Sequence, residues 1–293
     1  MFSIDTANLR LELEVVPVES LFIHERILPG IAKQLILEFK NLANLENPVI
    51  VDRNSIVLDG NHRTYVFKEL GFKYIPVCRI DYFNRDMQLR YWFRLLGNIK
   101  DRNLIGEVVE ELGGSLQEVT DRESMERMLE EDCYRCGVQQ ASLFATITFN
   151  EDMITDAVSA YDMLEKIQNR IRKRGGVLEY IPCQHMYDNE FCEALRDHEI
   201  VIWTPQITKE MVVEAARQKR VFAPKSTRHL IPARPLNVNI PTPWFKENIT
   251  LEEINRRFTR FLQAKGMRRL SPGQVINGRF YEEELFVFFD KRH

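Results

Sequence analysis

The sequence has few cysteines, and their spacing does not form a metal site. Only 5 of its 293 residues are cysteine, and Cys133 and Cys136 form a single C-x-x-C without a second pair or a following H-x(3–5)-H. A structural zinc site needs about four such ligands, so the pattern argues against one. We expect two reduced thiols in a polar loop, with a redox dithiol as the alternative. Cys78, Cys183 and Cys192 are scattered.

The sequence also lacks long apolar runs and a strong net charge. No window approaches the roughly 18 apolar residues of a membrane-spanning helix, and the N-terminus carries acids where a signal peptide needs an apolar run. We therefore expect a cytoplasmic protein with no membrane partner. Its 40 Lys and Arg against 43 Asp and Glu give a net charge of −3, which argues against nucleic acid as the main partner.

Hydrophobic periodicity in the first ninety residues predicts a compact α/β unit. Alternating residues predict strands, and apolar residues at helical spacing predict helices. The expected strands are 11–18, 48–52, 55–60 and 74–82, and the expected helices are 30–43 and a segment from about residue 61 that ends at Gly71.

The composition changes after residue 96. Segment 107–132 contains ten acids and only two bases, and its helical periodicity predicts a solvated helical insert or lid over 97–152. From residue 153 the pattern is again that of an α/β lobe. We therefore expect an α+β or α/β chain of three parts, whose terminal helix and strand could pack within the chain or across a homodimer.

The sharpest local feature is the segment SIVLDGNHRTYVFKELG (55–71). A strand ends in Asp59-Gly60, and a helix begins at about Asn61 with His62 and Arg63 in its first turn. Gly60 allows a turn that few residues adopt, and the unpaired N–H groups of a first helical turn favour anions. Arg63 and His62 add donors, and Asp59 could hold a divalent cation. This predicts a phosphate cradle, the alternative being an ordinary strand–turn–helix.

Two other segments combine polar groups with candidate chemistry. In LFIHER (21–26), Glu25 could act as a general base, although a solvated turn explains the same residues. Segment 217–234 contains six Lys or Arg and no acid. Within it PKSTRH (224–229) suits recognition of a carboxylate or a phosphate. A basic surface loop is the alternative, and few aromatics interleave as they would in a nucleic-acid patch.

The turn Asp59-Gly60-Asn61-His62-Arg63 resembles the signature box of the ParB/sulfiredoxin superfamily, roughly D-G-x-H-R. Within it the chain is most similar to the free serine kinases. The segments VVPVESLFIHE (15–25), ELGFKYIPVCRIDY (69–82) and PKSTRHLIPARPLNVNIP (224–241) extend the likeness to about residues 10–95 and 155–290.

The resemblance implies an activity and a domain arrangement. It implies phosphoryl transfer from ATP or ADP, with Mg²⁺, to the hydroxyl of free L-serine or a similar small hydroxylated amino acid. The expected parts are a ParB/sulfiredoxin-like nucleotide-binding domain (1–96), the acidic insert (97–152) and a substrate-binding α/β lobe (153–293).

The resemblance also implies roles for single residues. Glu25 matches the catalytic glutamate, and Asp59 matches the box aspartate near the metal and the reacting phosphate. The phosphate-binding positions are Gly60, His62 and Arg63, with Asn61 at the variable position of the same turn. The substrate-binding positions are Thr227, Arg228 and His229, with Lys225 and Ser226 beside them and Trp92 near a tryptophan that lines the site.

Alternatives within the same superfamily stay open at this point. A ParB-like nucleotide-gated DNA-binding or regulatory protein would need a helix-turn-helix, and none is evident after residue 95. Sulfiredoxin chemistry needs a cysteine in the box, where this chain has Asn61. A non-catalytic sensor would not require Glu25 and Asp59. The insert could change the acceptor to homoserine, threonine or another small hydroxylated metabolite.

Overall fold

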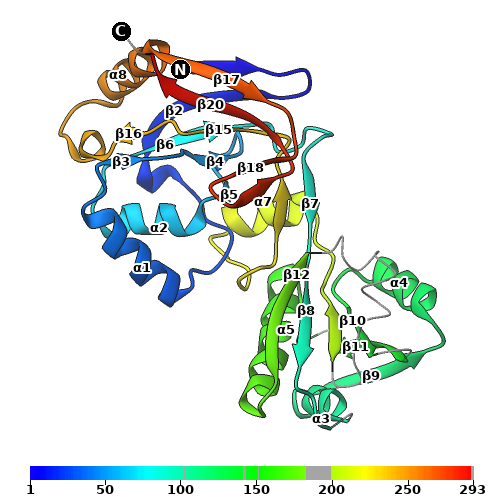
Figure 1. Cartoon of the computed structure of the whole chain (residues 1–293). Coiled ribbons are helices and arrows are strands. Elements are labelled where there is room, and N and C mark those ends of the chain that lie inside the picture. Colours follow the sequence, from blue (N-terminus) through cyan, green and yellow to red (C-terminus); the bar gives the residue numbers. More distant parts are fainter. Residues whose placement is uncertain (102, 141–142, 151, 183–198, 292–293) are drawn as a thin grey trace. The chain divides into compact units, whose positions relative to one another are not determined.

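The computed structural model describes residues 1–101, 103–140, 143–150, 152–182 and 199–291, and it divides the chain into two compact units (Figure 1). Unit 1 comprises residues 1–88, 216–219 and 229–293, and unit 2 comprises residues 89–215 and 220–228. Two of the crossings between units fall in the short strands β7 (Gln88–Arg90) and β14 (Arg228–Leu230). Within the described ranges, no helix is long and apolar enough to span a membrane.

Unit 1 is built on a five-stranded mixed sheet in the order β1-β2-β6-β4-β5. Strand β4 runs parallel to β6, and the other neighbouring pairs are antiparallel. The strands are β1 (Phe2–Asp5), β2 (Arg10–Pro17), β4 (Val49–Val51), β5 (Val57–Asp59) and β6 (Tyr74–Arg79). Alternate residues Leu11, Leu13 and Val15 of β2 are buried, as the periodicity predicts.

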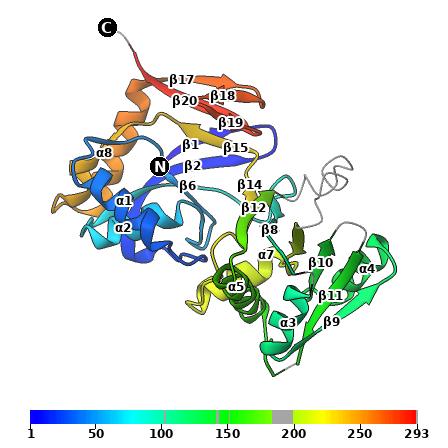
Figure 2. The same ribbon diagram turned by 60° about the horizontal axis from the view of Figure 1, so that its bottom comes forward.

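The rest of unit 1 packs around this sheet. It comprises the helices η1 (Val18–Ser20), α1 (Pro29–Lys40), α2 (Asn61–Glu69), η3 (Thr242–Lys246) and α8 (Leu251–Ala264), and the strands β3 (Asn44–Leu45), β15 (Ala233–Leu236), β16 (Ile240–Pro241), β17 (Lys265–Leu270), β18 (Gln274–Ile276), β19 (Arg279–Tyr281) and β20 (Glu284–Asp290). Strands β15, β20 and β17 form a three-stranded sheet, which Figure 2 shows beside β1 and β2. The terminal helix α8 packs within the chain, where Asn255 exchanges two 2.8 Å hydrogen bonds with the backbone of Val15.

Aromatic side chains fix α1 and α2 in unit 1. The ring of Phe67 lies 4.5 Å from that of Phe72, 5.7 Å from that of Phe39 and 5.8 Å from that of Phe245. Helix α1 is only partly buried, since Phe39 is buried whereas Ile31 is 44% exposed.

Unit 2 is an antiparallel sheet in the order β12-β8-β13-β10-β11-β9 with helices against it. Its strands are β8 (Trp92–Gly97), β9 (Gly114–Val119), β10 (Cys136–Gln140), β11 (Leu143–Phe149), β12 (Val177–Pro182) and β13 (Ile200–Trp203). Its helices are α3 (Leu104–Glu111), α4 (Arg122–Glu131), α5 (Ala157–Lys173) and α7 (Lys209–Arg217), the last of which ends in residues grouped with unit 1.

The structure divides the chain differently from the three expected parts. The acidic segment is not a separate helical insert, because β9, β10 and β11 belong to the sheet of unit 2 and β10 pairs with β13. Met125 and Leu129 of α4 pack with Phe93 and Trp203 of that sheet. The expected lobe 153–293 is likewise divided, since residues 229–293 belong to unit 1. The mixed α/β class itself is confirmed.

Candidate functional site

The turn between β5 and α2 has a backbone conformation that favours glycine. β5 ends at Asp59, Gly60 has φ 109° and ψ 27°, and α2 begins at Asn61. A Cβ atom on Gly60 would lie 2.6 Å from Cγ1 of the buried Val49. No side chain caps this helix start, so the N–H groups of its first turn lack an acceptor within the helix and suit an anionic ligand.

Asp59 is held ionised by two arginines. Nη1 of Arg234 donates to Oδ2 of Asp59 at 2.9 Å, and Nη2 of Arg63 lies 3.7 Å from the same oxygen. Burial alone would raise the pKa of Asp59, but the charges of Arg63 and Arg234 outweigh burial and hold the pKa below its ordinary value. The carboxylate is therefore charged at neutral pH.

Arg234 is a residue of the site that sequence reasoning missed. It lies on β15, is 9% exposed, and also forms an ion pair with Glu283. Burial lowers the pKa of Arg234, but the charges of Asp59 and Glu283 raise it overall. The signal in the sequence is faint: Arg234 is the last of the six Lys or Arg residues in segment 217–234.

The side chains of Asn61 and His62 contact the segment that carries Glu25. Oδ1 of Asn61 accepts a hydrogen bond from the N–H of His24 at 3.3 Å, and Nε2 of His62 accepts one from the N–H of Leu28 at 3.0 Å. The structure thus brings together two motifs that the sequence analysis singled out separately. Glu25 is half-buried between these two contacts.

Arg63, in the first turn of α2, is hydrogen-bonded to the two residues that precede β4. Its Nη1 donates to the carbonyl oxygens of Asn47 at 2.8 Å and Pro48 at 3.2 Å. In this structure the side chains of Asn61, His62 and Arg63 therefore all contact protein groups. Their contact with a phosphate stays a prediction.

A pocket of about 430 Å³ lies beside the turn in unit 1, and its lining includes Asp59, Arg63, Arg234, Arg279 and Tyr281. The guanidinium carbon of Arg279 lies 4.7 Å from the centre of the Tyr281 ring. Three guanidinium groups in one pocket suit an anionic ligand, because guanidinium donors match phosphate and carboxylate oxygens.

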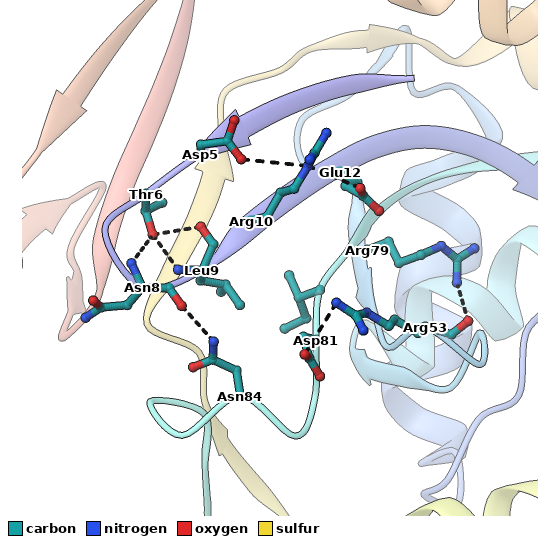
Figure 3. Close-up of a pocket in the computed structure, with 11 residues that line it drawn as sticks. Asp5, Thr6, Asn8, Leu9, Arg10, Glu12, Arg53, Arg79, Asp81 and Asn84 are labelled. Carbon is teal, nitrogen blue, oxygen red and sulfur yellow. Dashed lines mark hydrogen bonds and ion pairs between the residues drawn. The ribbon is translucent and has the colours of Figure 1, made fainter.

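A second pocket of unit 1, about 280 Å³ in volume, lies between the β1–β2 turn and the segment that follows β6 (Figure 3). Each of its arginines forms an ion pair with a carboxylate: Arg10 with Glu12 at 3.3 Å, Arg53 with Asp81 at 3.4 Å and Arg79 with Glu14 at 2.7 Å. None of the expected site residues lines this pocket. We therefore assign the candidate site to the turn after β5.

His24 and His229 meet inside unit 1. Nδ1 of the buried His24 lies 2.7 Å from the carbonyl oxygen of Val57, and its ring stands edge-on to that of His229 at 5.3 Å. Oη of Tyr82 lies 2.8 Å from Nε2 of His229. Burial lowers the pKa of His24 despite the nearby charge of Glu25. One expected substrate-binding residue therefore lies next to the segment that carries Glu25.

The other expected substrate-binding residues belong to unit 2. Nε1 of Trp92 donates to the carbonyl oxygen of Thr227 at 3.1 Å. Nζ of Lys225 and the guanidinium carbon of Arg228 lie 4.7 Å and 5.7 Å from the Trp92 ring. Ser226 is fully buried, and its hydroxyl donates to a backbone carbonyl at 2.6 Å. Trp92 thus organises this segment, and Ser226 stabilises its turn.

Metal and thiol chemistry find limited support in the part of the chain that the structure describes. It contains no cluster of three or more His, Cys, Asp or Glu that could hold a metal ion. Mg²⁺ needs only one or two carboxylates when phosphates supply other ligands, so Asp59 fits an ion that accompanies a nucleotide.

Burial raises the pKa of Cys136 to about 12 and also raises that of Cys133, so neither is a ready nucleophile. Cys183 and Cys192 lie outside the described residues.

The fold and site define a mixed α/β protein with a candidate anion-binding turn next to an ionised aspartate. No family model matches the chain, but curated relatives do. An ATP-dependent L-serine kinase of Staphylothermus marinus is 29% identical over 241 residues, which cover 78% of this chain and 88% of the relative. An ADP-dependent L-serine kinase of Thermococcus kodakarensis is 24% identical over 186 residues, 63% of this chain and 71% of the relative. A ParB-like protein of Sulfolobus acidocaldarius is 27% identical over 221 residues, 75% of this chain and 90% of the relative.

Solved structures share the fold. A free serine kinase in complex with AMP has a TM-score of 0.63 at 18% identity and covers 80% of this chain and 94% of its own. SbnI from Staphylococcus aureus, with a C-terminal truncation, has a TM-score of 0.65 at 18% identity. The match covers 86% of this chain and 95% of the SbnI chain. The curated relatives confirm the resemblance to the serine kinases that the box and its flanking segments indicate.

Proposed function

We propose that the protein is a kinase that phosphorylates the hydroxyl of free L-serine to give O-phospho-L-serine. The curated serine kinases support a phosphotransferase that acts on a hydroxyl group. The observation that carries the proposal is the contact between the Asp59-Gly60 turn and the segment of Glu25. A candidate phosphate site and a candidate base are adjacent there, as transfer to a hydroxyl requires.

The residues have distinct roles in the proposed reaction. The oxygen of the serine hydroxyl forms a bond to the terminal phosphorus, and Glu25 accepts the proton that this hydroxyl loses. The bond from that phosphorus to the bridging oxygen breaks, and the shortened nucleotide leaves. The N–H groups after Gly60 hold the phosphates, and Arg234 and Arg279 balance their charge. Positioning and charge neutralisation supply most of the rate in this class of reaction.

The phosphate donor is ATP or ADP. Serine kinases among the relatives use one or the other, and Asn61 at the variable position of the box does not distinguish them. Mg²⁺ bound with the nucleotide would neutralise phosphate oxygens, and Asp59 is the carboxylate that would contact it. Trp92 and the segment from Lys225 to His229 would bind the amino acid. We expect the protein in the cytoplasm.

A second candidate is a ParB-like nucleotide-gated DNA-binding or regulatory protein. It is favoured by the ParB-like relative alone. Against it stands the acidic segment 107–132, which a phosphate backbone repels. A gel-shift at low salt distinguishes the two, because the kinase proposal expects no shifted band with or without nucleotide.

The test is to incubate the purified full chain with Mg²⁺, either ATP or ADP, and a panel of free hydroxy amino acids. Mass spectrometry then identifies the phosphorylated product. We expect O-phosphoserine with one of the two donors. Phosphorylation of another acceptor would keep the reaction and change the substrate, whereas no product from any pair would reject the kinase proposal.

A further inference from the structure

The segment that carries Glu25 is held to the core of unit 1 at its start. The N–H of Phe22 donates to the carbonyl of Ser55 at 3.0 Å, and the N–H of Val57 donates to the carbonyl of Phe22 at 2.9 Å. Beyond this bridge the chain runs through Glu25 to Leu28, which caps the start of α1. The backbone position of Glu25 therefore depends on what holds residues 24–28.

Two consecutive residues of the box hold the two ends of this segment. On one side of Glu25, Asn61 accepts the hydrogen bond from the N–H of His24 at 3.3 Å. On the other side, His62 accepts the hydrogen bond from the N–H of Leu28 at 3.0 Å. Both acceptors belong to the first turn of α2, directly after Gly60.

The hydrogen bond of His62 also bears on its role. In the observed geometry Nε2 of His62 accepts the hydrogen bond from the N–H of Leu28. A ring nitrogen that accepts this hydrogen bond does not at the same time donate to a phosphate oxygen. The observed geometry is thus that of a residue that orients the backbone near Glu25.

We propose that Asn61 and His62 are positioning residues that set Glu25 relative to the phosphate. The inference rests on the proposed function, in which Glu25 is the base. The same helical turn that binds the phosphates would then place the base at a fixed distance from the reacting phosphorus. Misplacement of a reacting group by about 1 Å can lower a reaction rate about 100-fold. Loss of either contact would therefore lower the rate of phosphoryl transfer without weakening nucleotide binding.

The kinetic test compares His62→Phe and Asn61→Ala with wild type and with Lys68→Gln. The control residue Lys68 is an exposed side chain of the same helix. We expect His62→Phe and Asn61→Ala to lower kcat about 10- to 100-fold, with the nucleotide Kd within about threefold of wild type. His62→Gln keeps an acceptor near the position of Nε2 and should recover most of the activity. A large rise in nucleotide Kd would overturn the inference, since it would assign His62 to the phosphate.

A double-substitution cycle tests whether His62 acts through Glu25. When Glu25→Gln already removes the base, His62→Phe should cause little further loss of the residual rate. Independent losses that multiply would overturn the inference, because they would indicate a separate role for His62.

Amide hydrogen exchange tests the same contacts without an activity readout. His62→Phe should speed exchange at the N–H of Leu28, and Asn61→Ala at that of His24, whereas Lys68→Gln should change neither. If wild type makes no phosphorylated product, the proposed function fails while exchange still reports on the contacts. Unchanged exchange in both variants would reject the positioning role.

Discussion

The turn at Gly60 gives the sharpest prediction about stability. Gly60→Ala places a β-carbon at φ 109°, 2.6 Å from Cγ1 of Val49. The left-handed backbone costs an L-residue about 1–2 kcal/mol, and forcing an extra carbon against a packed side chain costs about 1–3 kcal/mol. Val49 is fully buried, so it has little room to move. We expect the free energy of unfolding to fall by about 2–5 kcal/mol, out of a typical total of about 5–15.

Gly71→Ala is the matched control for this substitution. Gly71 follows the other end of α2 with φ 67°, and a β-carbon there would have no heavy atom within 4 Å. Gly71→Ala should therefore lower the free energy of unfolding only by the backbone strain, about 1–2 kcal/mol. Urea denaturation followed by circular dichroism gives both values. If Gly60→Ala destabilises the protein no more than Gly71→Ala, the contact with Val49 does not constrain the turn and the reasoning is wrong.

Three further predictions concern Arg234, His24 and Trp92. Arg234→Met should lower the free energy of unfolding by about 1–3 kcal/mol, because it removes one of the two cationic partners of Asp59 and the partner of the largely buried Glu283. Arg234→Lys should recover part of this loss, and equal values for both variants would contradict the ion pairs. Burial lowers the native pKa of His24 below the unfolded value of 6.5, so acidification below that pH should destabilise the fold by at most about 1.4 kcal/mol per pH unit. His24→Asn should flatten this decline in denaturation curves from pH 7.5 to 5, and identical slopes would refute the assignment. Trp92→Phe should raise the KM for serine about 3- to 10-fold through the lost hydrogen bond to Thr227, with the nucleotide Kd unchanged as the check.

The local part of the site could be predicted from the sequence. An apolar strand, an Asp-Gly turn and an amphipathic helix are encoded within residues 55–71, and the structure has them as β5, Gly60 and α2. The resemblance to the serine kinases depended on the same few residues. Such features are short-range, because backbone sterics and periodicity determine them.

The partners of those residues could not be predicted. Arg234 reaches Asp59 from 175 residues away, and no local pattern encodes which strand end will lie beside the turn. Likewise Asn61, which has no fixed identity in the box, is given a role only by its contact with His24. Tertiary packing decides both.

The expectation that the acidic segment 107–132 is a solvated insert was wrong for a physical reason. Its acids lie largely on exposed positions of α3 and α4, while Ile105 and Val108 of α3, and Met125 and Leu129 of α4, are buried. These exposed acids dominate the composition of the segment, and this is why the composition favoured a solvated insert. The buried residues join the core of unit 2, which makes the segment integral to that sheet.

The central claim is that Glu25, beside the Asp59-Gly60 turn, accepts the proton of the serine hydroxyl. The measurement that tests it most directly is the rate of O-phosphoserine formation by Glu25→Gln, with nucleotide affinity measured by calorimetry on the same protein. Glu19→Gln, an exposed glutamate paired with Lys68 at 2.7 Å, is the control. We predict a loss of at least about 100-fold for Glu25→Gln, nucleotide affinity within a few-fold of wild type, and no change for Glu19→Gln. Full activity in Glu25→Gln, or loss of its nucleotide binding, would contradict the claim.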